Sequence, residues 1–125
     1  MQPTTHLHTA KDERVFVFGS NQRGIHGAGA AYYAASKLGA RQGIGEGLTG
    51  RAYALPTCIR PAMPMTLSDV GAAIGRFIEF ARSTPETRYF VSEVGCGLAG
   101  FEPCDIAPFF ADAPENCDLP PGWRK

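Results

Sequence analysis

Two glycine-rich segments of this 125-residue chain carry the residue types suited to binding an anion. The first, residues 19–29, combines glycines with Ser20, Asn21 and His26, and the second, residues 95–101, reads GCGLAGF. Glycines leave the main-chain N–H groups accessible, and such groups hold phosphate without help from Lys or Arg. The two segments therefore predict a diphosphate site built from main-chain amides.

Four side chains are candidates for catalysis, three of them in or beside these segments. Asn21 directly follows an apolar run, where it either fixes a turn or contacts a ligand. His26 lies among glycines, so we expect it outside the core, as a phosphate donor, a general base or a plain surface histidine. Glu93 and, in another loop, Glu46 are the carboxylates within reach of a ligand. We expect only one of Ser92 and Glu93 to face the cleft.

The cysteines and the N-terminal histidines offer weaker alternatives. Cys96 lies beside the expected anion site, where N–H groups would lower the pKa of its thiol, although packing is the simpler role. No two of the four cysteines have the two-residue gap of a zinc knuckle. His6 and His8 form a His-x-His pair that suits a metal, but a solvated tail is the expectation because no third ligand is near. We expect no metal and no cofactor.

The segments between these residues alternate between strand and helix patterns. Residues 15–18 form a short β-rich apolar run, and residues 30–38 then follow helical spacing. A capped amphipathic helix is predicted from Thr66 to Ala81. Residues 1–13 read as a polar tail, with a short strand near Thr4–His8 as the alternative. Further strands are expected at residues 51–56, 88–94 and 116–119, a short helix at 103–110, a glycine-rich lid or turn at 39–50, and a connection at 57–65.

This alternation predicts an α/β fold, with a mixed, mostly parallel sheet and helices on both faces. In open α/β sheets the ligand crevice lies at the carboxyl ends of the strands. Both glycine-rich loops follow strands, so we expect them to form the two walls of one cleft.

Composition and missing motifs exclude several function classes. Twelve basic residues balance twelve acidic ones, which disfavours general nucleic-acid binding. Neither a signal peptide nor a membrane-spanning apolar run is present, so we expect a cytoplasmic protein without membrane association. The chain also lacks a Gly-Lys-Ser/Thr phosphate loop, a G-x-G-x-x-G fingerprint and a Gly-x-Ser-x-Gly elbow.

The segments FGSNQRGIHGAGAA, RAYALPT and YFVSEVGCGLAGF resemble the macro domains, which bind ADP-ribose, and more closely a small bacterial and phage-associated branch of macro-like proteins. The resemblance runs from Val15 to about Pro121 and implies a single three-layer macro-like domain over residues 1–125. It implies a ligand-binding set of Ser20, Asn21, Gly27, Ala28, Gly29, Gly95, Cys96, Gly97, Leu98, Ala99, Gly100 and Phe101. In this set Phe101 takes the place of an aromatic residue that packs on the ribose.

The chain also departs from the macro-domain pattern. The strand whose following Asp contacts adenine is missing, and Asp12 is only a weak substitute. Carboxylates of the hydrolytic branches are replaced by His26 and Ala99. The resemblance therefore implies binding of ADP-ribose, or of an ADP-ribosylated macromolecule, with or without hydrolysis of ADP-ribosyl esters or ADP-ribose 1″-phosphate. A non-catalytic reader, a Rossmann-like nucleotide sensor and a phage-associated interaction protein are the alternatives.

Overall fold

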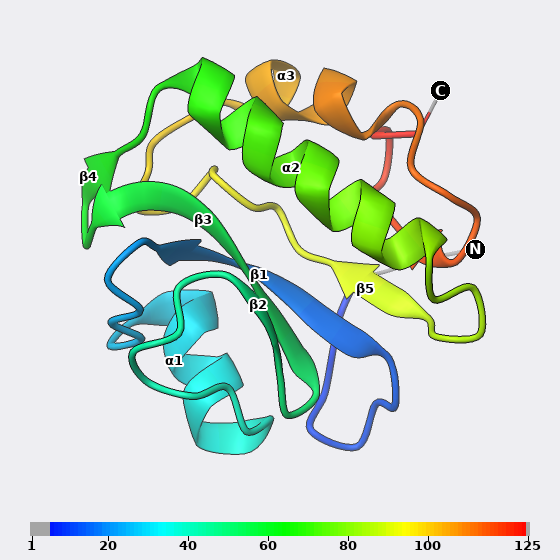
Figure 1. The fold of residues 1–125 in the computed structure, drawn as a ribbon, viewed down its shortest axis with the longest axis horizontal. Coiled ribbons are helices and arrows are strands. Elements are labelled where there is room, and N and C mark those ends of the chain that lie inside the picture. The colour runs from blue at the N-terminus through cyan, green and yellow to red at the C-terminus, as the bar shows by residue number, and fades with distance from the viewer. Residues whose placement is uncertain (1–5, 125) are drawn as a thin grey trace, which may run out of the picture.

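Residues 6–124, which the computed structural model describes, form one mixed sheet of six strands between helical layers (Figure 1). The elements are β1 (Val15–Asn21), α1 (Gly29–Lys37), β2 (Gly47–Thr49), β3 (Ala52–Arg60), β4 (Met63–Pro64), α2 (Leu67–Arg82), β5 (Tyr89–Val91), α3 (Pro103–Ile106), a 3-10 turn η1 (Ala107–Phe110) and β6 (Cys117–Asp118). The order is β2-β3-β1-β5-β6, with β4 paired to β3. Strands β3, β1, β5 and β6 run parallel, and β2 and β4 are antiparallel to β3. The predicted fold class is confirmed.

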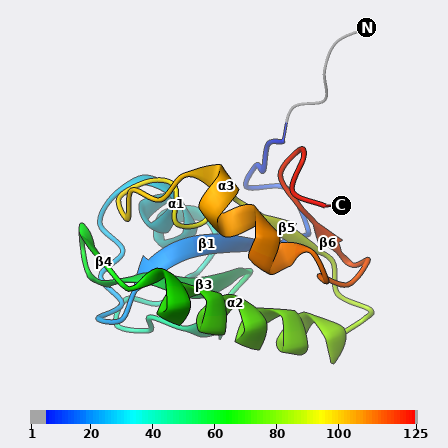
Figure 2. The same ribbon diagram turned by 90° about the horizontal axis from the view of Figure 1, so that it is seen from above.

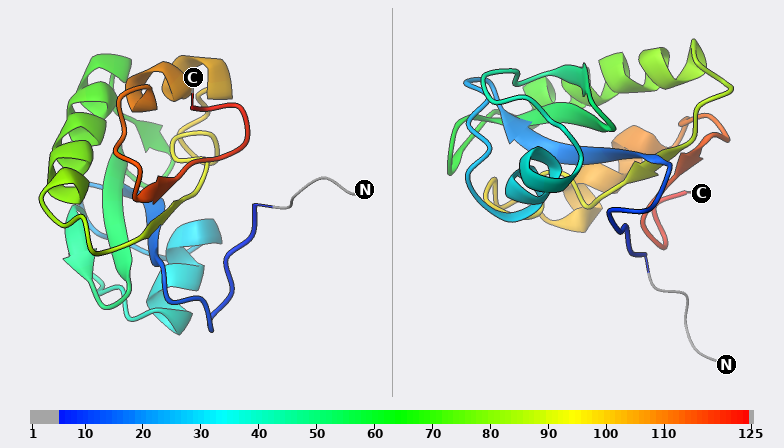
Figure 3. Two further views of the ribbon diagram at one scale, coloured as in Figure 1. Left: turned by 90° about the vertical axis from the view of Figure 1, so that its right-hand side faces the viewer. Right: turned by 90° about the horizontal axis from the view of Figure 1, so that it is seen from below.

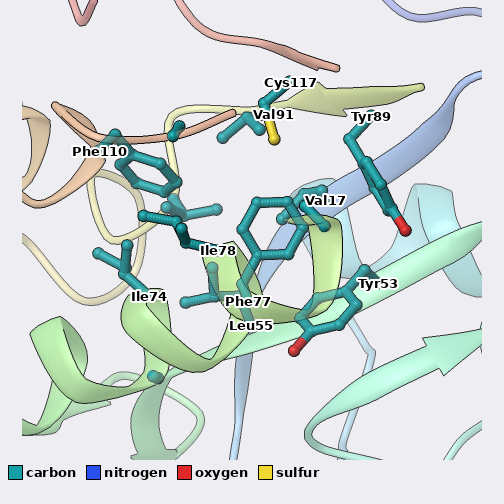
Figure 4. Packing of buried hydrophobic residues seen from close by; sticks show 14 of the residues in the cluster. Val17, Tyr53, Leu55, Ile74, Phe77, Ile78, Tyr89, Val91, Phe110 and Cys117 are labelled. Carbon is teal, nitrogen blue, oxygen red and sulfur yellow. The ribbon is translucent and has the colours of Figure 1, made fainter. Parts of the chain in front are cut away.

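The central strand β1 is apolar on both faces because a helical layer covers each of them (Figure 2). Val15 and Val17 belong to the core cluster beneath α2, whereas Phe16 and Phe18 belong to the cluster beneath α1. Figure 4 shows Val17 close to Phe77 of α2 within the larger cluster. Burial on both sides of β1 fixes the direction in which it leads into the first glycine-rich loop.

Helix α2 follows its amphipathic pattern closely. The Thr66 side chain accepts a hydrogen bond from the backbone N–H of Asp69 at 3.1 Å, which caps the first turn. Its buried face consists of Val70, Ala73, Ile74, Phe77, Ile78 and Ala81. The predicted helix is confirmed, with its last residue at Arg82.

Strand lengths differ from the expected ones. β3 continues from the expected end at Pro56 to Arg60 and turns into β4, so the expectation of a plain connection over residues 57–65 is wrong. Proline lacks the N–H of a sheet ladder, and the register of β1 against β3 shifts next to Pro56, between Ser20 and Asn21. β5 ends at Val91, three residues before its expected end.

The N-terminal segment runs alongside α1 from residue 6 onward (Figure 3), and it packs onto the sheet through His6 and His8. The His6 ring stacks on Phe90 with the ring centres 4.0 Å apart. The His8 ring nitrogens lie 2.8 Å from the Tyr33 hydroxyl and 3.0 Å from the Arg14 carbonyl oxygen. The expectation of a solvated tail is therefore wrong for both histidines, because they cover aromatic surface of the sheet. Residues 6–8 form no strand, and residues 1–5 lie outside the described part of the chain.

Candidate functional site

A cavity of about 490 Å³ lies where the carboxyl ends of β1, β3 and β5 meet. The first glycine-rich loop and the start of α1 form one wall, and the second glycine-rich loop contributes to the other; Figure 2 shows these segments side by side. Its lining comes from residues 19–21, 25, 27–31, 57–58, 61–62, 92–95 and 97–99. The prediction that both loops share one cleft is confirmed.

At Gly19, which lines the cavity, β1 closely approaches both β3 and the second glycine-rich loop. A Cβ atom on Gly19 would lie 3.3 Å from Thr57 Oγ1 and 3.4 Å from the backbone N of Gly95. Contacts this tight are rare for a real Cβ, so the neighbours would have to shift. The absence of a side chain at Gly19 therefore lets β1, β3 and the second loop converge.

Asn21 lines the cavity but uses its side-chain amide within the protein. Its Oδ1 accepts a hydrogen bond from the backbone N–H of Ile25 at 3.1 Å, and its Nδ2 donates to the Ile25 carbonyl oxygen at 2.9 Å. The residue is buried, with 6% of its surface exposed. Of the two roles considered for Asn21, fixing the turn is the one that these hydrogen bonds perform.

His26 is buried behind the first loop, with 1% of its surface exposed, so the expectation that it lies outside the core is wrong. Its Nε2 donates to the Ile44 carbonyl oxygen at 3.1 Å, and its ring packs edge-on against Phe18. The Gln42 side chain pairs with both the backbone N–H and the carbonyl oxygen of His26, at 2.9 and 3.0 Å. His26 is not among the lining residues, so it has no geometry for acid–base catalysis there.

Residues 39–50 support the first loop rather than covering the cavity. A Cβ on Gly24 would collide with the backbone of Gly43, and one on Gly45 would collide with the carbonyl oxygen of Asn21. Gly24 and Gly43 also have positive φ angles of 70° and 91°. Of the two interpretations of this glycine-rich stretch, unusual backbone torsions are the one observed. Glu46 within it forms an ion pair with Arg76 at 2.7 Å and does not line the cavity.

Main-chain N–H groups around the cavity are available as donors. Helix α1 has no side-chain cap at Ala28, so its first-turn amides and the positive end of its dipole remain open. No described residue accepts a hydrogen bond from the backbone N–H of Gly27, Gly95, Gly97 or Leu98. A Cβ on Gly27 or Gly97 would meet no atom within 4 Å, so both glycines border open space. This arrangement can solvate an anion without a cationic side chain.

Only some of the ligand-binding residues predicted in the second loop line the cavity. Gly95, Gly97, Leu98 and Ala99 are lining residues, whereas Cys96, Gly100 and Phe101 are not. Phe101 instead packs against the larger core cluster.

The Cys96 thiol is not activated. Burial, together with the carboxylates of Glu93, Glu102 and Asp105, raises the pKa of Cys96 to about 11. The expectation of a lowered pKa is wrong, because burial and negative charge outweigh any effect of the loop N–H groups. At neutral pH the thiol stays protonated and is a poor nucleophile.

Ser92 and Glu93 both line the cavity, so the expectation that only one of them faces it is wrong. Side chains alternate only along a strand, and β5 has already ended at Val91. Sequence reasoning missed Thr57 and Cys58, because residues 57–65 were expected to form a connection. The signal was present in the apolar residues that continue beyond Pro56.

A second cavity of about 520 Å³ adjoins the first and shares Gly29, Ala30, Ser92 and Glu93 with it. Its remaining lining includes aromatic side chains: His6, His8, Phe16, Tyr33 and Phe90. Asp12, the weak substitute for an adenine-binding Asp, lines neither cavity. The Arg14 guanidinium binds the Asp12 carboxylate and holds its pKa well below the usual value.

Comparison with known proteins identifies no relative from which the site could be interpreted. No protein-family model, no curated protein and no solved structure matches the chain. Over residues 6–124, no three His, Cys, Asp or Glu side chains gather in a way that would hold a metal ion. The same residues include no helix with both the length and the apolarity needed to cross a bilayer.

Proposed function

We propose that the protein binds ADP-ribose, or a closely related nucleotide diphosphate, in the cavity between the two glycine-rich loops. The observation that carries this proposal is the open N-terminus of α1 facing a cavity to which Gly27, Gly95 and Gly97 also contribute. Main-chain N–H groups at a helix N-terminus are suited to a diphosphate. The volume of about 490 Å³ lies within the ~300–1,000 Å³ of small-molecule sites.

The same geometry favours a non-catalytic reader over a hydrolase. Glu93 is the one carboxylate that lines the first cavity, and its side chain is exposed. His26 is buried away from the cavity, and the Cys96 thiol is protonated at neutral pH. Water attack on an ADP-ribosyl ester or on ADP-ribose 1″-phosphate requires a base positioned at the reacting atom. Of the predicted catalytic residues that line the cavity, Asn21 uses its amide to bind Ile25, and the Glu93 side chain has no described hydrogen-bond partner to position it as a base, which supports the reader. From the sequence we further propose that this reader acts in the cytoplasm.

Calorimetric titration with ADP-ribose tests the binding proposal, with ribose 5-phosphate as the control that lacks the diphosphate. We expect saturable one-to-one binding of ADP-ribose and much weaker binding of the control. Absence of heat at millimolar ADP-ribose would remove the proposal. A thermal-shift panel of other nucleotides then distinguishes a Rossmann-like sensor from an interaction protein that binds none of them.

An activity assay separates the reader from the hydrolase. ADP-ribosylated protein and ADP-ribose 1″-phosphate are incubated with the wild-type protein and with Glu93→Gln. The reader proposal predicts no turnover by either protein. Turnover that is lost in Glu93→Gln would establish hydrolysis with Glu93 as the catalytic carboxylate.

A further inference from the structure

Each hydroxyl side chain that lines the first cavity donates its proton in a hydrogen bond to a backbone carbonyl oxygen of the protein. Ser92 Oγ donates to the Val17 carbonyl oxygen at 2.6 Å, and Ser20 Oγ donates to the Gly45 carbonyl oxygen at 2.5 Å. Thr57 Oγ1 donates to the Ser20 carbonyl oxygen at 3.4 Å. A hydroxyl has one proton and two lone pairs, so these groups have only acceptor capacity left for a ligand.

The one charged side chain that lines the cavity is a carboxylate. Glu93 is the only ionisable acid or base among the lining residues apart from the Cys58 thiol, and no lysine or arginine lines the cavity. Glu102 and Asp105 lie close enough to the second loop to act, with Glu93, on the Cys96 thiol. Carboxylates therefore lie on and near the second-loop wall, and no cationic side chain lines the cavity to offset Glu93.

Donors and acceptors in the site come from different kinds of group. Donors come from the main chain, at Gly27, the first turn of α1 and the second loop. Acceptors come from side chains, at Ser92, Thr57 and Glu93. Sugar hydroxyls can donate hydrogen bonds to such acceptors. A phosphate monoester instead presents mainly acceptor oxygens and adds about 1.5–2 negative charges near pH 7.

We propose that this cavity selects ligands with a neutral, hydroxyl-bearing end and rejects those that end in a phosphate monoester, with Glu93 as the specificity-determining residue. The inference rests on the proposed function and narrows it. The diphosphate lies at the Gly27 loop and the N-terminus of α1, and the sugar hydroxyls lie against Ser92 and Glu93. ADP-ribose fits this order of groups, whereas ADP-ribose 1″-phosphate would place a dianion beside the Glu93 carboxylate.

Competitive calorimetry with ADP-ribose and ADP-ribose 1″-phosphate tests the inference on three proteins. These are the wild type, Glu93→Gln and the matched control Glu86→Gln, which removes the same charge from an exposed turn that lines neither cavity. We expect the wild type and Glu86→Gln to bind ADP-ribose at least tenfold more tightly than its 1″-phosphate. In Glu93→Gln the gap should shrink to about threefold or less, mainly through tighter binding of the phosphate.

Each result has a defined meaning. Equal binding of the two ligands by the wild type would overturn the selectivity. A gap that stays unchanged in Glu93→Gln, or that shrinks equally in Glu86→Gln, would overturn the role of Glu93. Failure of all three proteins to bind ADP-ribose would instead overturn the proposed function. Circular dichroism of the variants checks that each is folded, as expected for exposed glutamates with no hydrogen-bonded partner among the described residues.

Discussion

The two glycine-rich loops share one cavity but are held in different ways. The first loop is fixed by side-chain hydrogen bonds: a local pair from Asn21 to Ile25, and a longer-range pair between His26 and Gln42 of another loop. The second loop is held by local main-chain turns, such as the bond from the Phe101 N–H to the Gly95 carbonyl oxygen at 2.9 Å. Because the first loop is tied to the rest of the fold, its glycines serve folding as well as any ligand.

The largest effect expected from this difference is at Gly24. In Gly24→Ala the new Cβ collides with the Gly43 backbone, and the positive φ of 70° adds strain. We expect a loss of about 3 kcal/mol or more in the free energy of unfolding, measured by urea denaturation. The matched change in the second loop, Gly97→Ala, meets no atom within 4 Å and should cost less than about 0.5 kcal/mol. Equal losses would remove the distinction between the loops.

A smaller effect is expected at Asn21. Asn21→Ala removes both part-buried hydrogen bonds to the main chain of Ile25, which should lower the free energy of unfolding by about 1–2 kcal/mol. Asn21→Asp keeps the acceptor for the Ile25 N–H but replaces the donor with a carboxylate oxygen against the Ile25 carbonyl oxygen, so it should not restore the lost stability. Denaturation at neutral pH measures both. If Asn21→Ala unfolds like the wild type, the hydrogen bonds from Asn21 to Ile25 do not contribute to stability.

The second loop should make the stability of the protein sensitive to alkaline pH, through Cys96. Burial raises the pKa of the Cys96 thiol from 9.0 to about 11. The protonated thiol therefore contributes to the free energy of unfolding below pH 9, and this contribution is lost as the pH rises toward 11. We expect stability to decline over this range, and to decline less steeply in Cys96→Ala. Part of the pH dependence that remains in Cys96→Ala comes from Cys117, whose pKa burial also raises to about 11, and part from Cys58 and Tyr89, whose pKa values burial raises as well. An identical pH profile for Cys96→Ala and the wild type would contradict the raised pKa.

The smallest effect on stability is expected at Gly27, together with a large effect on binding. Gly27→Ala places a methyl group in open space at the cavity, and its backbone φ is not in the left-handed region. The free energy of unfolding should change by less than about 0.5 kcal/mol, while ADP-ribose binding weakens about tenfold or more. Gly75→Ala is the control, because that position in α2 is equally open and lies outside both cavities. Unchanged ADP-ribose binding by Gly27→Ala would place the ligand elsewhere.

Local patterns predicted most of the fold. The apolar run at Val15–Phe18 and the spacing within residues 66–81 predicted β1 and α2, because hydrophobic periodicity reflects burial directly. The rule that ligands bind at the carboxyl ends of parallel strands placed both loops at one cavity.

The errors arose where distant residues decide a local structure. His26 is buried because Gln42 and Ile44, in another loop, fold over it. Ser92 and Glu93 both reach the cavity because β5 ends early, which neighbouring residues do not signal. Likewise, the Cys96 pKa depends on Glu102 and Asp105, whose proximity to the thiol is a property of the fold.

Titration of ¹⁵N-labelled protein with ADP-ribose, followed by amide NMR shifts, tests the central claim most directly. The account predicts that the largest shifts occur at the amides of Gly27, Ala28, Gly95, Gly97 and Leu98, with saturation at one ligand per chain. Shifts that cluster on residues outside both loops, or no shifts at millimolar ADP-ribose, would contradict it.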